Sequence, residues 1–343
     1  METNKKRWLW VDIVKGVASL SIVLAHTMSW YQLESVKYLS GWEVVVFFFV
    51  AGYLIREPKR EQGFDTFVIK MLKRLILPYF ILCFINLGLE LLRLWIAGTP
   101  GLHQIPTWLL GIVYCEPNQM PNCTPLWFLP CLFVVRLLME LLLRQKPAAQ
   151  IAIVAAALVG AELLILFSVP RLPWNIGAAL FSLIFCYYGH LLRKFSLFEK
   201  LEAKPLPLRW GAILGMLVLG LLVIRTNGIR LRLHVLQVGN PLLAILGGVL
   251  CGTAVMLLCR ALGRFEGNPA CRLLGWVGQH TMFVVGFDFF TRTLVSDLLT
   301  AAGAHALLLM YLLRLVLLLG GCWVYTRLIS RISRPGLREA LSF

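Results

Sequence analysis

The stretch that decides the fold is WLWVDIVKGVASLSIVLAHTMSWY, which runs from Trp8 to Tyr31. It is long enough to cross the hydrocarbon core of a bilayer, which takes about 20 mainly apolar helical residues. Three ionisable side chains interrupt it, namely Asp12, Lys15 and His26. Each such group costs roughly 2.5–3.5 kcal/mol inside a membrane and faces a protein interior or a water-filled cavity. The stretch therefore predicts a membrane-spanning helix with a functional face.

Asp12, Lys15 and His26 share one face of that predicted helix. Eleven residues at about 100° each bring His26 within about 20° of Lys15, and Asp12 lies within about 40° of His26. At about 1.5 Å per residue, Lys15 and His26 are roughly 16 Å apart along the axis. The pattern indicates a polar stripe running through the membrane. A lysine that snorkels to the interface and a histidine satisfied by a neighbouring helix would give the same pattern.

The rest of the chain repeats the apolar pattern of this first span. Of its 343 residues 59% are hydrophobic and 15% are charged, whereas a soluble domain has about 25% charged residues. We predict an all-α membrane protein of about ten transmembrane helices, forming one integral-membrane domain over residues 1–343. The expected spans are 8–30, 42–55, 75–93, 125–143, 149–169, 174–192, 209–224, 241–259, 278–300 and 304–325.

The basic residues set the orientation of these spans. Most of the 33 Lys and Arg residues lie in the segments 5–7, 56–74, 144–147, 193–209, 260–272 and 327–338. The opposite segments hold Lys37, Arg171, Arg225, Arg230 and Arg232. By the positive-inside rule both termini are predicted to be cytoplasmic. The net charge of +16 is then a topological signal and no sign of nucleic-acid binding. The expected location is a cell membrane.

The nine cysteines form no CxxC pattern and no cluster with histidine, so the sequence indicates no metal site. Cys115 and Cys123 bracket CEPNQMPNC in a segment predicted to face outward. In an oxidising compartment they would form a disulfide. Two unpaired thiols are the alternative.

Further charged residues extend the candidate site. Glu43 opens the second span at about the depth of His26, where a carboxylate would raise the basicity of the imidazole. A simple interfacial charge is the alternative for Glu43. The cytoplasmic segment 56–74 contains a cluster that suits a polyphosphate ligand such as coenzyme A, or anionic lipid head groups. Its members are Arg56, Lys59, Arg60, Lys70, Lys73 and Arg74.

Two charged pairs lie four residues apart on predicted helices. Arg136 and Glu140 are on the fourth span, and Asp288 and Arg292 are on the ninth. Opposite charges at this spacing can neutralise each other along one helix. We expect a structural role for the first pair and leave the role of Asp288 open.

Several motifs in order resemble the acyltransferase family 3 membrane proteins. LWVDIVKGVASLSIVLAH at 9–26 matches the opening of that family, a basic residue and a histidine separated by ten residues, here Lys15 and His26. FFFVAGYLI at 47–55, KRLILPYF at 73–80 and LWFLPCLFVV at 126–135 follow, and GQHTMFVVGFD at 278–288 resembles a later segment. That segment ends in Asp288, where related glycan acetylases often have histidine.

The resemblance implies a membrane O-acyltransferase. Such an enzyme moves an acyl group, most often acetyl, from cytoplasmic acyl-CoA to a hydroxyl of a cell-envelope glycan or lipid-linked sugar. It implies that His26 is catalytic, and it places the basic residue of the motif at Lys15. His26 would act as a base or as an acyl carrier. We add Asp12 and Glu43 to the expected catalytic residues because of their positions near Lys15 and His26. The expected donor-binding residues are Arg56, Lys73, Arg74 and Tyr79. The expected acceptor-binding residues are Glu116, Asn122 and Trp127.

The resemblance further implies acetyl-CoA as the co-substrate and the cytoplasmic membrane of a bacterium as the location. Membrane lipids are further expected partners. Two other functions fit the same residues. In a transporter or flippase of a glycan lipid, the polar stripe would line a translocation path. A non-catalytic membrane component would have the same fold without the enzymatic activity. The sequence leaves the oligomeric state open.

Overall fold

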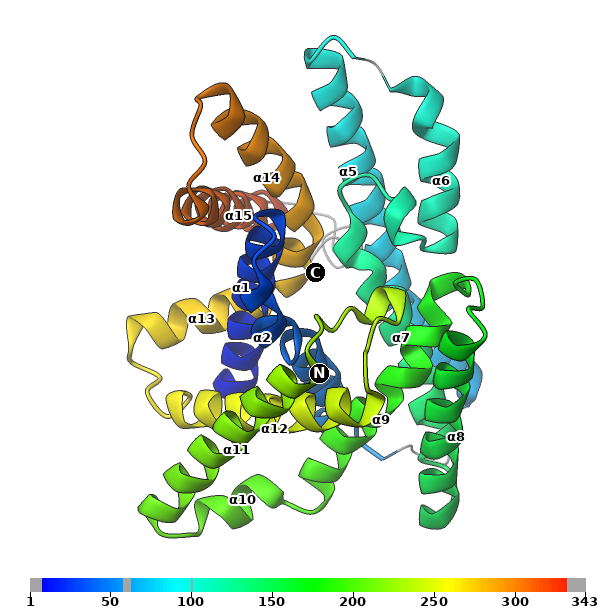
Figure 1. Ribbon diagram of the computed structural model, residues 1–343, viewed down its shortest axis with the longest axis vertical. Helices are drawn as coiled ribbons and strands as arrows, with labels where there is room; N and C mark the ends of the chain where they lie inside the picture. Colours follow the sequence, from blue (N-terminus) through cyan, green and yellow to red (C-terminus); the bar gives the residue numbers. More distant parts are fainter. Residues whose placement is uncertain (1–7, 58–62, 100, 332–343) are drawn as a thin grey trace. The chain divides into compact units, whose positions relative to one another are not determined.

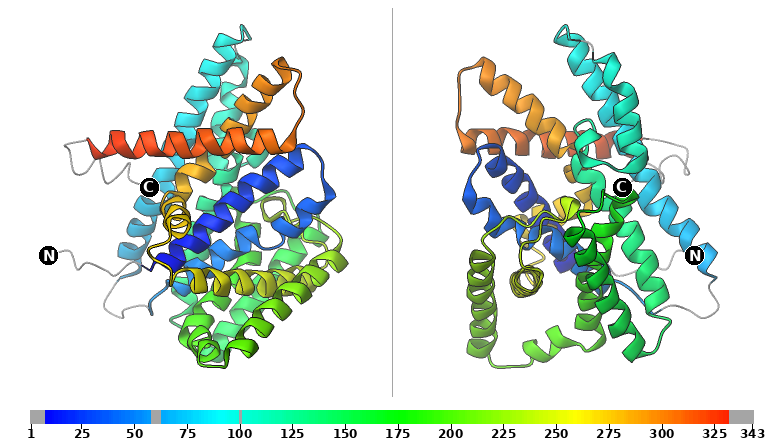
Figure 2. Two further views of the ribbon diagram at one scale, coloured as in Figure 1. Left: turned by 90° about the vertical axis from the view of Figure 1, so that its left-hand side faces the viewer. Right: turned by 45° about the vertical axis from the view of Figure 1, so that its right-hand side comes forward.

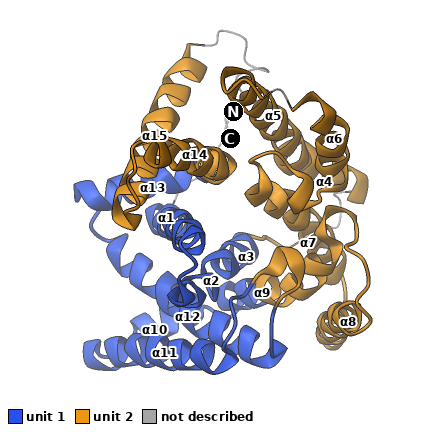
Figure 3. Ribbon diagram, turned by 45° about the horizontal axis from the view of Figure 1, so that its top comes forward, with its two compact units in different colours: residues 1–54, 188–231, 238–281 blue, residues 55–187, 232–237, 282–343 orange. Residues whose placement is uncertain are grey.

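A computed structural model describes residues 8–57, 63–99 and 101–331 of the protein. All the regular elements in this described part are helices, and Figure 1 labels most of the α-helices. Nine helical stretches within it are long and apolar enough to cross a membrane. The prediction of an all-α membrane protein is thus confirmed. The described chain forms two compact units, which Figure 3 shows in two colours.

Unit 1 comprises residues 1–54, 188–231 and 238–281. Its helices are α1 (Leu9–Trp30), α2 (Lys37–Ser40), α3 (Glu43–Tyr53), the end of α9 (Ile176–Lys194), α10 (Leu197–Glu202), α11 (Leu206–Asn227), α12 (Pro241–Leu262) and α13 (Pro269–Gln279). Helices α11 and α12 lie side by side in this unit (Figure 2). Helix α1 packs on α3, α12 and α13.

Unit 2 comprises residues 55–187, 232–237 and 282–343. Its helices are α4 (Phe64–Met71), α5 (Leu77–Ile96), α6 (Ile105–Tyr114), α7 (Phe128–Leu142), α8 (Pro147–Leu166), the first part of α9, α14 (Thr281–Ala301) and α15 (Leu307–Ser330). A π-helical segment, Leu72–Ile76, joins α4 to α5. Pro78 has no N–H to donate to the carbonyl of Arg74, so the α-helical ladder cannot continue there.

The span expected over 278–300 begins at a different place in the structure. The helical conformation is interrupted at His280, between the end of α13 and the start of α14. Helix α14 carries Asp288, Arg292 and Asp297, and it is not among the nine stretches apolar enough to cross a membrane. Helix α13 itself was not predicted. Its start is fixed by Asn268, whose side chain accepts hydrogen bonds from the backbone N–H groups of Ala270 and Cys271 at 2.9 and 3.4 Å.

The backbones of α1 and α13 touch at two glycines. A Cβ atom on Gly16 would lie 2.1 Å from the carbonyl oxygen of Leu274, and one on Gly278 would lie 1.7 Å from that of Asp12. Glycine is the residue that allows two helices to approach this closely. This contact places the end of α13 beside the first two turns of α1.

A buried ion pair joins α14 to α15 in unit 2. The Asp288 carboxylate pairs with the Arg314 guanidinium, and neither side chain is exposed to solvent. Arg314 also donates to the backbone carbonyl of Asp288 at 3.2 Å. The sequence pattern had suggested Arg292 as the partner of Asp288. The structure adds Arg314 from another helix, while the Arg292 guanidinium lies 3.9 Å above the ring of Phe289.

Glu140 of α7 pairs with Arg144 at 2.8 Å, near the end of the helix. The Arg136 guanidinium lies 5.8 Å from the centre of the Phe67 ring on α4. Arg136 and Arg144 each lie four residues from Glu140, on opposite sides of it. A neutralising contact between Arg136 and Glu140 stays a prediction.

Replacing Gly278 tests the contact between α1 and α13. Because a methyl group there would overlap the Asp12 carbonyl, Gly278→Ala should lower the free energy of unfolding by about 1–3 kcal/mol. The matched control is Gly211→Ala on α11, where no atom lies within 4 Å of the added methyl group. Thermal unfolding in detergent measures both. Equal melting temperatures for the two variants would contradict the close packing.

Removing one partner of the buried ion pair should be strongly destabilising. Asp288→Asn or Arg314→Met should each lower the free energy of unfolding by about 3–5 kcal/mol, because either variant leaves one buried charge without its counter-charge. Arg144→Ala, which breaks the solvated pair with Glu140, should cost about 0–1 kcal/mol. Denaturant unfolding of the purified variants gives the comparison. If the free energy of unfolding fell by similar amounts for the buried and the solvated pair, the burial of the Asp288–Arg314 pair would be contradicted.

Candidate functional site

The polar face of α1 begins with an ion pair. The Lys15 Nζ atom lies 2.8 Å from Asp12 Oδ1, with the two side chains 24% and 4% exposed. Gln279, the last residue of α13, lies with its Nε2 atom 3.5 Å from the other Asp12 oxygen. A buried carboxylate needs such a counter-charge and donors, since removing it from water without them is costly. The structure thus brings together two of the predicted catalytic residues.

Ser19 and Thr281 extend this polar face by a further turn. The Ser19 hydroxyl donates to the Lys15 carbonyl at 2.8 Å and lies 3.4 Å from the Thr281 hydroxyl. Sequence reasoning missed both residues. Ser19 follows Asp12 by seven residues and so shares its face, which is a signal that the sequence contains. Gln279 and Thr281 flank the helix break at His280, and no periodicity marks them.

His26 lies two turns beyond Ser19 on the same face of α1, and it is partly exposed. Glu43, the first residue of α3, belongs to the same unit and is only 3% exposed. A contact between the Glu43 carboxylate and the His26 imidazole stays a prediction. Asp12, Lys15, His26 and Glu43 all lie in unit 1.

The predicted donor-binding residues lie in unit 2. Arg56 is exposed, as are Lys73 and Arg74 in the π-helical segment that joins α4 to α5. Tyr79 is fully buried, and its hydroxyl donates to the backbone carbonyl of Ile112 on α6 at 2.6 Å. That contact gives Tyr79 a packing role in unit 2. Lys59 and Arg60 lie outside the described residues.

The predicted acceptor-binding residues also lie in unit 2, each with a defined neighbour. Glu116 pairs with Arg171. Trp127 is 6% exposed, and its ring lies 5.7 Å from that of His234. Asn122 has a left-handed backbone conformation and takes part in a polar network.

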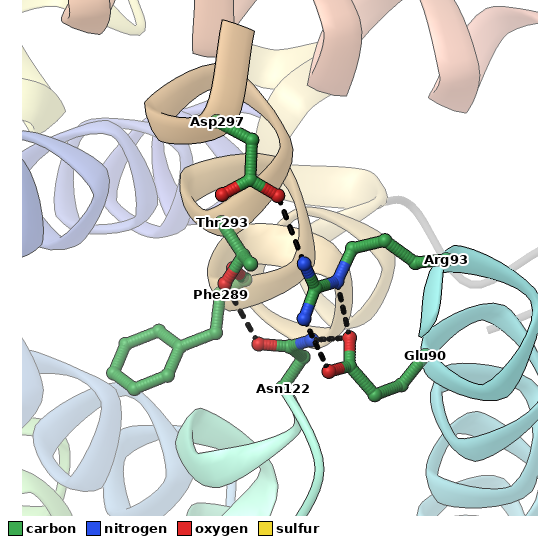
Figure 4. A network of polar contacts seen from close by, with 6 residues as sticks. All are labelled: Glu90, Arg93, Asn122, Phe289, Thr293 and Asp297. Carbon is green, nitrogen blue, oxygen red and sulfur yellow. Dashed lines mark hydrogen bonds and ion pairs between the residues drawn. The ribbon is translucent and has the colours of Figure 1, made fainter. Parts of the chain in front are cut away.

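This network centres on the Glu90 carboxylate of α5 (Figure 4). Arg93 donates to both Glu90 oxygens, at 2.9 and 2.7 Å, and reaches Asp297 of α14 at 2.9 Å. Asn122 donates to Glu90 and accepts from the Thr293 hydroxyl at 2.8 Å. The spacing of Glu90 and Arg93 indicates one of these contacts, but the others join segments distant in sequence. The network ties the segment around Asn122 to α5 and α14.

The family model of the acyltransferase domain matches residues 8–327, nearly the whole chain. The chain belongs to acyltransferase family 3. No curated protein sequence and no solved structure matches it. With nine candidate spans among its described residues, this member of acyltransferase family 3 is a multi-pass membrane acyltransferase.

Cys115 and Cys123 are both buried in this family 3 acyltransferase, and each is a free thiol. Cys115 is 2% exposed, and the side-chain amide of Asn175 lies 3.4 Å from its sulfur. Burial raises the pKa of the Cys115 thiol to about 12. A thiol with so high a pKa holds little reactive thiolate at neutral pH.

Cys115 should therefore resist alkylation in the folded protein. At pH 7.5 its thiolate fraction is roughly a thousandfold below that of an ordinary cysteine with a pKa near 8.5. Mass spectrometry after maleimide treatment should find Cys115 unmodified in detergent and fully modified in denaturant. The native rate should keep rising with pH above 9, because the thiol titrates near pH 12. Rapid native labelling, or a Cys115–Cys123 disulfide peptide, would refute this assignment.

Proposed function

We propose that this protein transfers an acyl group from cytoplasmic acyl-CoA to a hydroxyl of a cell-envelope glycan or lipid-linked sugar. Acetyl-CoA is the proposed donor, and the cytoplasmic membrane of a bacterium is the proposed location. The observation that carries the proposal is the polar face of α1. There the Asp12–Lys15 ion pair and His26 are aligned in a chain of acyltransferase family 3.

The reaction requires the protein mainly to position the donor and the acceptor and to transfer a proton. An acyl thioester is already activated, so the acceptor oxygen must be brought to its carbonyl carbon and lose its proton. Imidazole titrates near neutral pH and suits this task. In direct transfer His26 takes the hydroxyl proton, the oxygen attacks the carbonyl carbon, and the CoA sulfur leaves and is protonated. In the relay, the His26 nitrogen attacks the thioester carbonyl carbon and the CoA thiolate leaves. The acceptor oxygen then attacks the acyl carbon, the bond to His26 breaks, and the hydroxyl proton passes to the released thiolate.

Lys15 cannot act on the same atoms as His26. Eleven helical residues separate them by roughly 16 Å along the axis. We therefore assign Lys15 to donor binding, with Asp12 as the positioning residue that holds its ammonium on the polar face. Glu43 remains the proposed carboxylate partner of His26.

The remaining binding residues are proposed on their chemistry. Arg56, Lys73 and Arg74 are exposed cations that suit phosphate groups. Glu116 and Asn122 carry the oxygen and amide groups that bind sugar hydroxyls. Tyr79 and Trp127 are less suited to direct ligand contact, because both are buried in unit 2.

The test uses the purified protein with radiolabelled acetyl-CoA. His26→Ala should lower thioester cleavage by about 10²–10⁴-fold, the range for loss of a general base. The matched control is His103→Ala, which removes an exposed histidine in unit 2 and should leave cleavage unchanged. Label retained on the wild-type protein and lost in His26→Ala would favour the relay. A wild type that neither binds nor cleaves any acyl-CoA would overturn the proposal and favour glycolipid transport.

A further inference from the structure

Helices α5 and α14 of unit 2 are joined by charged side chains. Glu90 and Arg93 lie on α5, and Asp297 lies on α14. The Arg93 guanidinium pairs with Glu90 at 2.7 Å and with Asp297 at 2.9 Å, so it connects the two helices. Asn122 and Thr293 extend these contacts (Figure 4). We call these five residues the α5–α14 network.

Ionisable groups are unusual in such helices. Glu90 and Arg93 belong to the helical stretch Phe64–Ile96, which contains a window with a mean hydropathy of 2.1. Helix α14 was expected to be a span, yet its polar residues keep it outside the apolar stretches of the described chain. Charged groups in membrane segments face the protein interior or a water-filled cavity, and they mark substrate pathways. The α5–α14 network is therefore a candidate for ligand contact.

The α5–α14 network has hydrogen-bonding capacity that its members do not use. A guanidinium has five N–H donors, and a carboxylate has about four acceptor positions. Arg93 donates once from Nε and once from each terminal nitrogen, which leaves one hydrogen on each of the terminal nitrogens. Among the described residues Asp297 accepts only from Arg93, and its side chain is 55% exposed. At the exposed edge of the network, spare donors thus lie beside spare acceptors.

The charges of the α5–α14 network select the class of ligand. Two carboxylates against one guanidinium give a net negative charge, so a phosphate or carboxylate ligand would be repelled. The polyanionic CoA donor does not fit such a site. A hydroxyl both donates and accepts hydrogen bonds. It can donate to Asp297 and accept from Arg93, and the neighbouring hydroxyls of a neutral sugar repeat this pattern.

We propose that Arg93 and Asp297 form a subsite for an uncharged sugar of the acceptor. The sugar hydroxyls donate to the Asp297 carboxylate and accept from the Arg93 guanidinium. Glu90 is the positioning residue that fixes this guanidinium. Asn122, already proposed for acceptor binding, donates to Glu90 beside the subsite. The inference rests on the proposed function and narrows its acceptor to a neutral sugar.

The alternative is a network that only ties α5 to α14. A purely structural network affects the stability of the protein, but it cannot distinguish one sugar from another. A subsite that contains the Asp297 carboxylate distinguishes a neutral sugar from the same sugar carrying a carboxylate. Sugar selectivity therefore separates the two roles.

The experiment measures the binding of radiolabelled octyl β-glucoside to the full-length protein in a sugar-free detergent. Excess tetraethylene glycol monooctyl ether, which has the same alkyl chain without a sugar, occupies sites that bind the chain alone. A hydrogen bond to a charged group contributes roughly ten- to a hundredfold in affinity. Asp297→Ala should raise the dissociation constant of octyl β-glucoside by that factor and leave that of acetyl-CoA unchanged. The matched control is Glu34→Ala, which removes an exposed carboxylate of unit 1 and should change neither constant.

Asp297→Asn provides a second variant, which keeps the size of the side chain and removes its charge. The wild type should bind octyl β-glucuronide more weakly than octyl β-glucoside, because the glucuronide carboxylate is repelled. Asp297→Asn should narrow this difference between the two ligands. A loss of folding would weaken both ligands alike, and melting temperatures report on folding.

Three results would refute the sugar subsite. The wild type does not bind octyl β-glucoside, Asp297→Ala leaves its dissociation constant unchanged, or Asp297→Asn keeps the full preference over the glucuronide. In each case, cleavage of acetyl-CoA by the wild type would leave the proposed function standing. A wild type that neither binds nor cleaves any acyl-CoA overturns the proposed function, and with it the role of this subsite in acylation.

Discussion

The contact between the backbones of α1 and α13 is the constraint on which the candidate site depends. Gly16 and Gly278 leave no room for side chains where the helices cross, so the two main chains set each other's position. This places Gln279 beside Asp12, and it places the helix break at His280 along the polar face. Together with its ion pair to Lys15, this contact covers the Asp12 carboxylate, whose side chain is 4% exposed. In lipid the same carboxylate would be too costly to bury.

The residues of α1 could be predicted from the sequence because their arrangement is local. A helix repeats every 3.6 residues, so the spacing of Asp12, Lys15 and His26 determines that they share a face. The apolar runs predicted most spans for the same reason. Helix α13 was missed because it is short and not strongly apolar. Its Asn268–Pro269 start, which resembles Asn240–Pro241 at the start of α12, is a capping signal that could have revealed it.

The long-range contacts could not be predicted in this way. Arg292 lies four residues from Asp288 on the same helix, yet the ion pair of Asp288 with Arg314 joins two helices. That contact depends on which helices pack together. The network around Glu90 is likewise assembled from distant segments. Sequence spacing carries no information about such encounters.

The buried pair between α14 and α15 has a consequence for biosynthesis. Helix α14 emerges from the ribosome with Asp288 unneutralised by Arg314, which is 26 residues further along the chain. A lone charged helix partitions poorly from the translocon into lipid. The buried pair therefore cannot form until α15 has been made. The packing of α14 inside unit 2 thus depends on the helix that follows it.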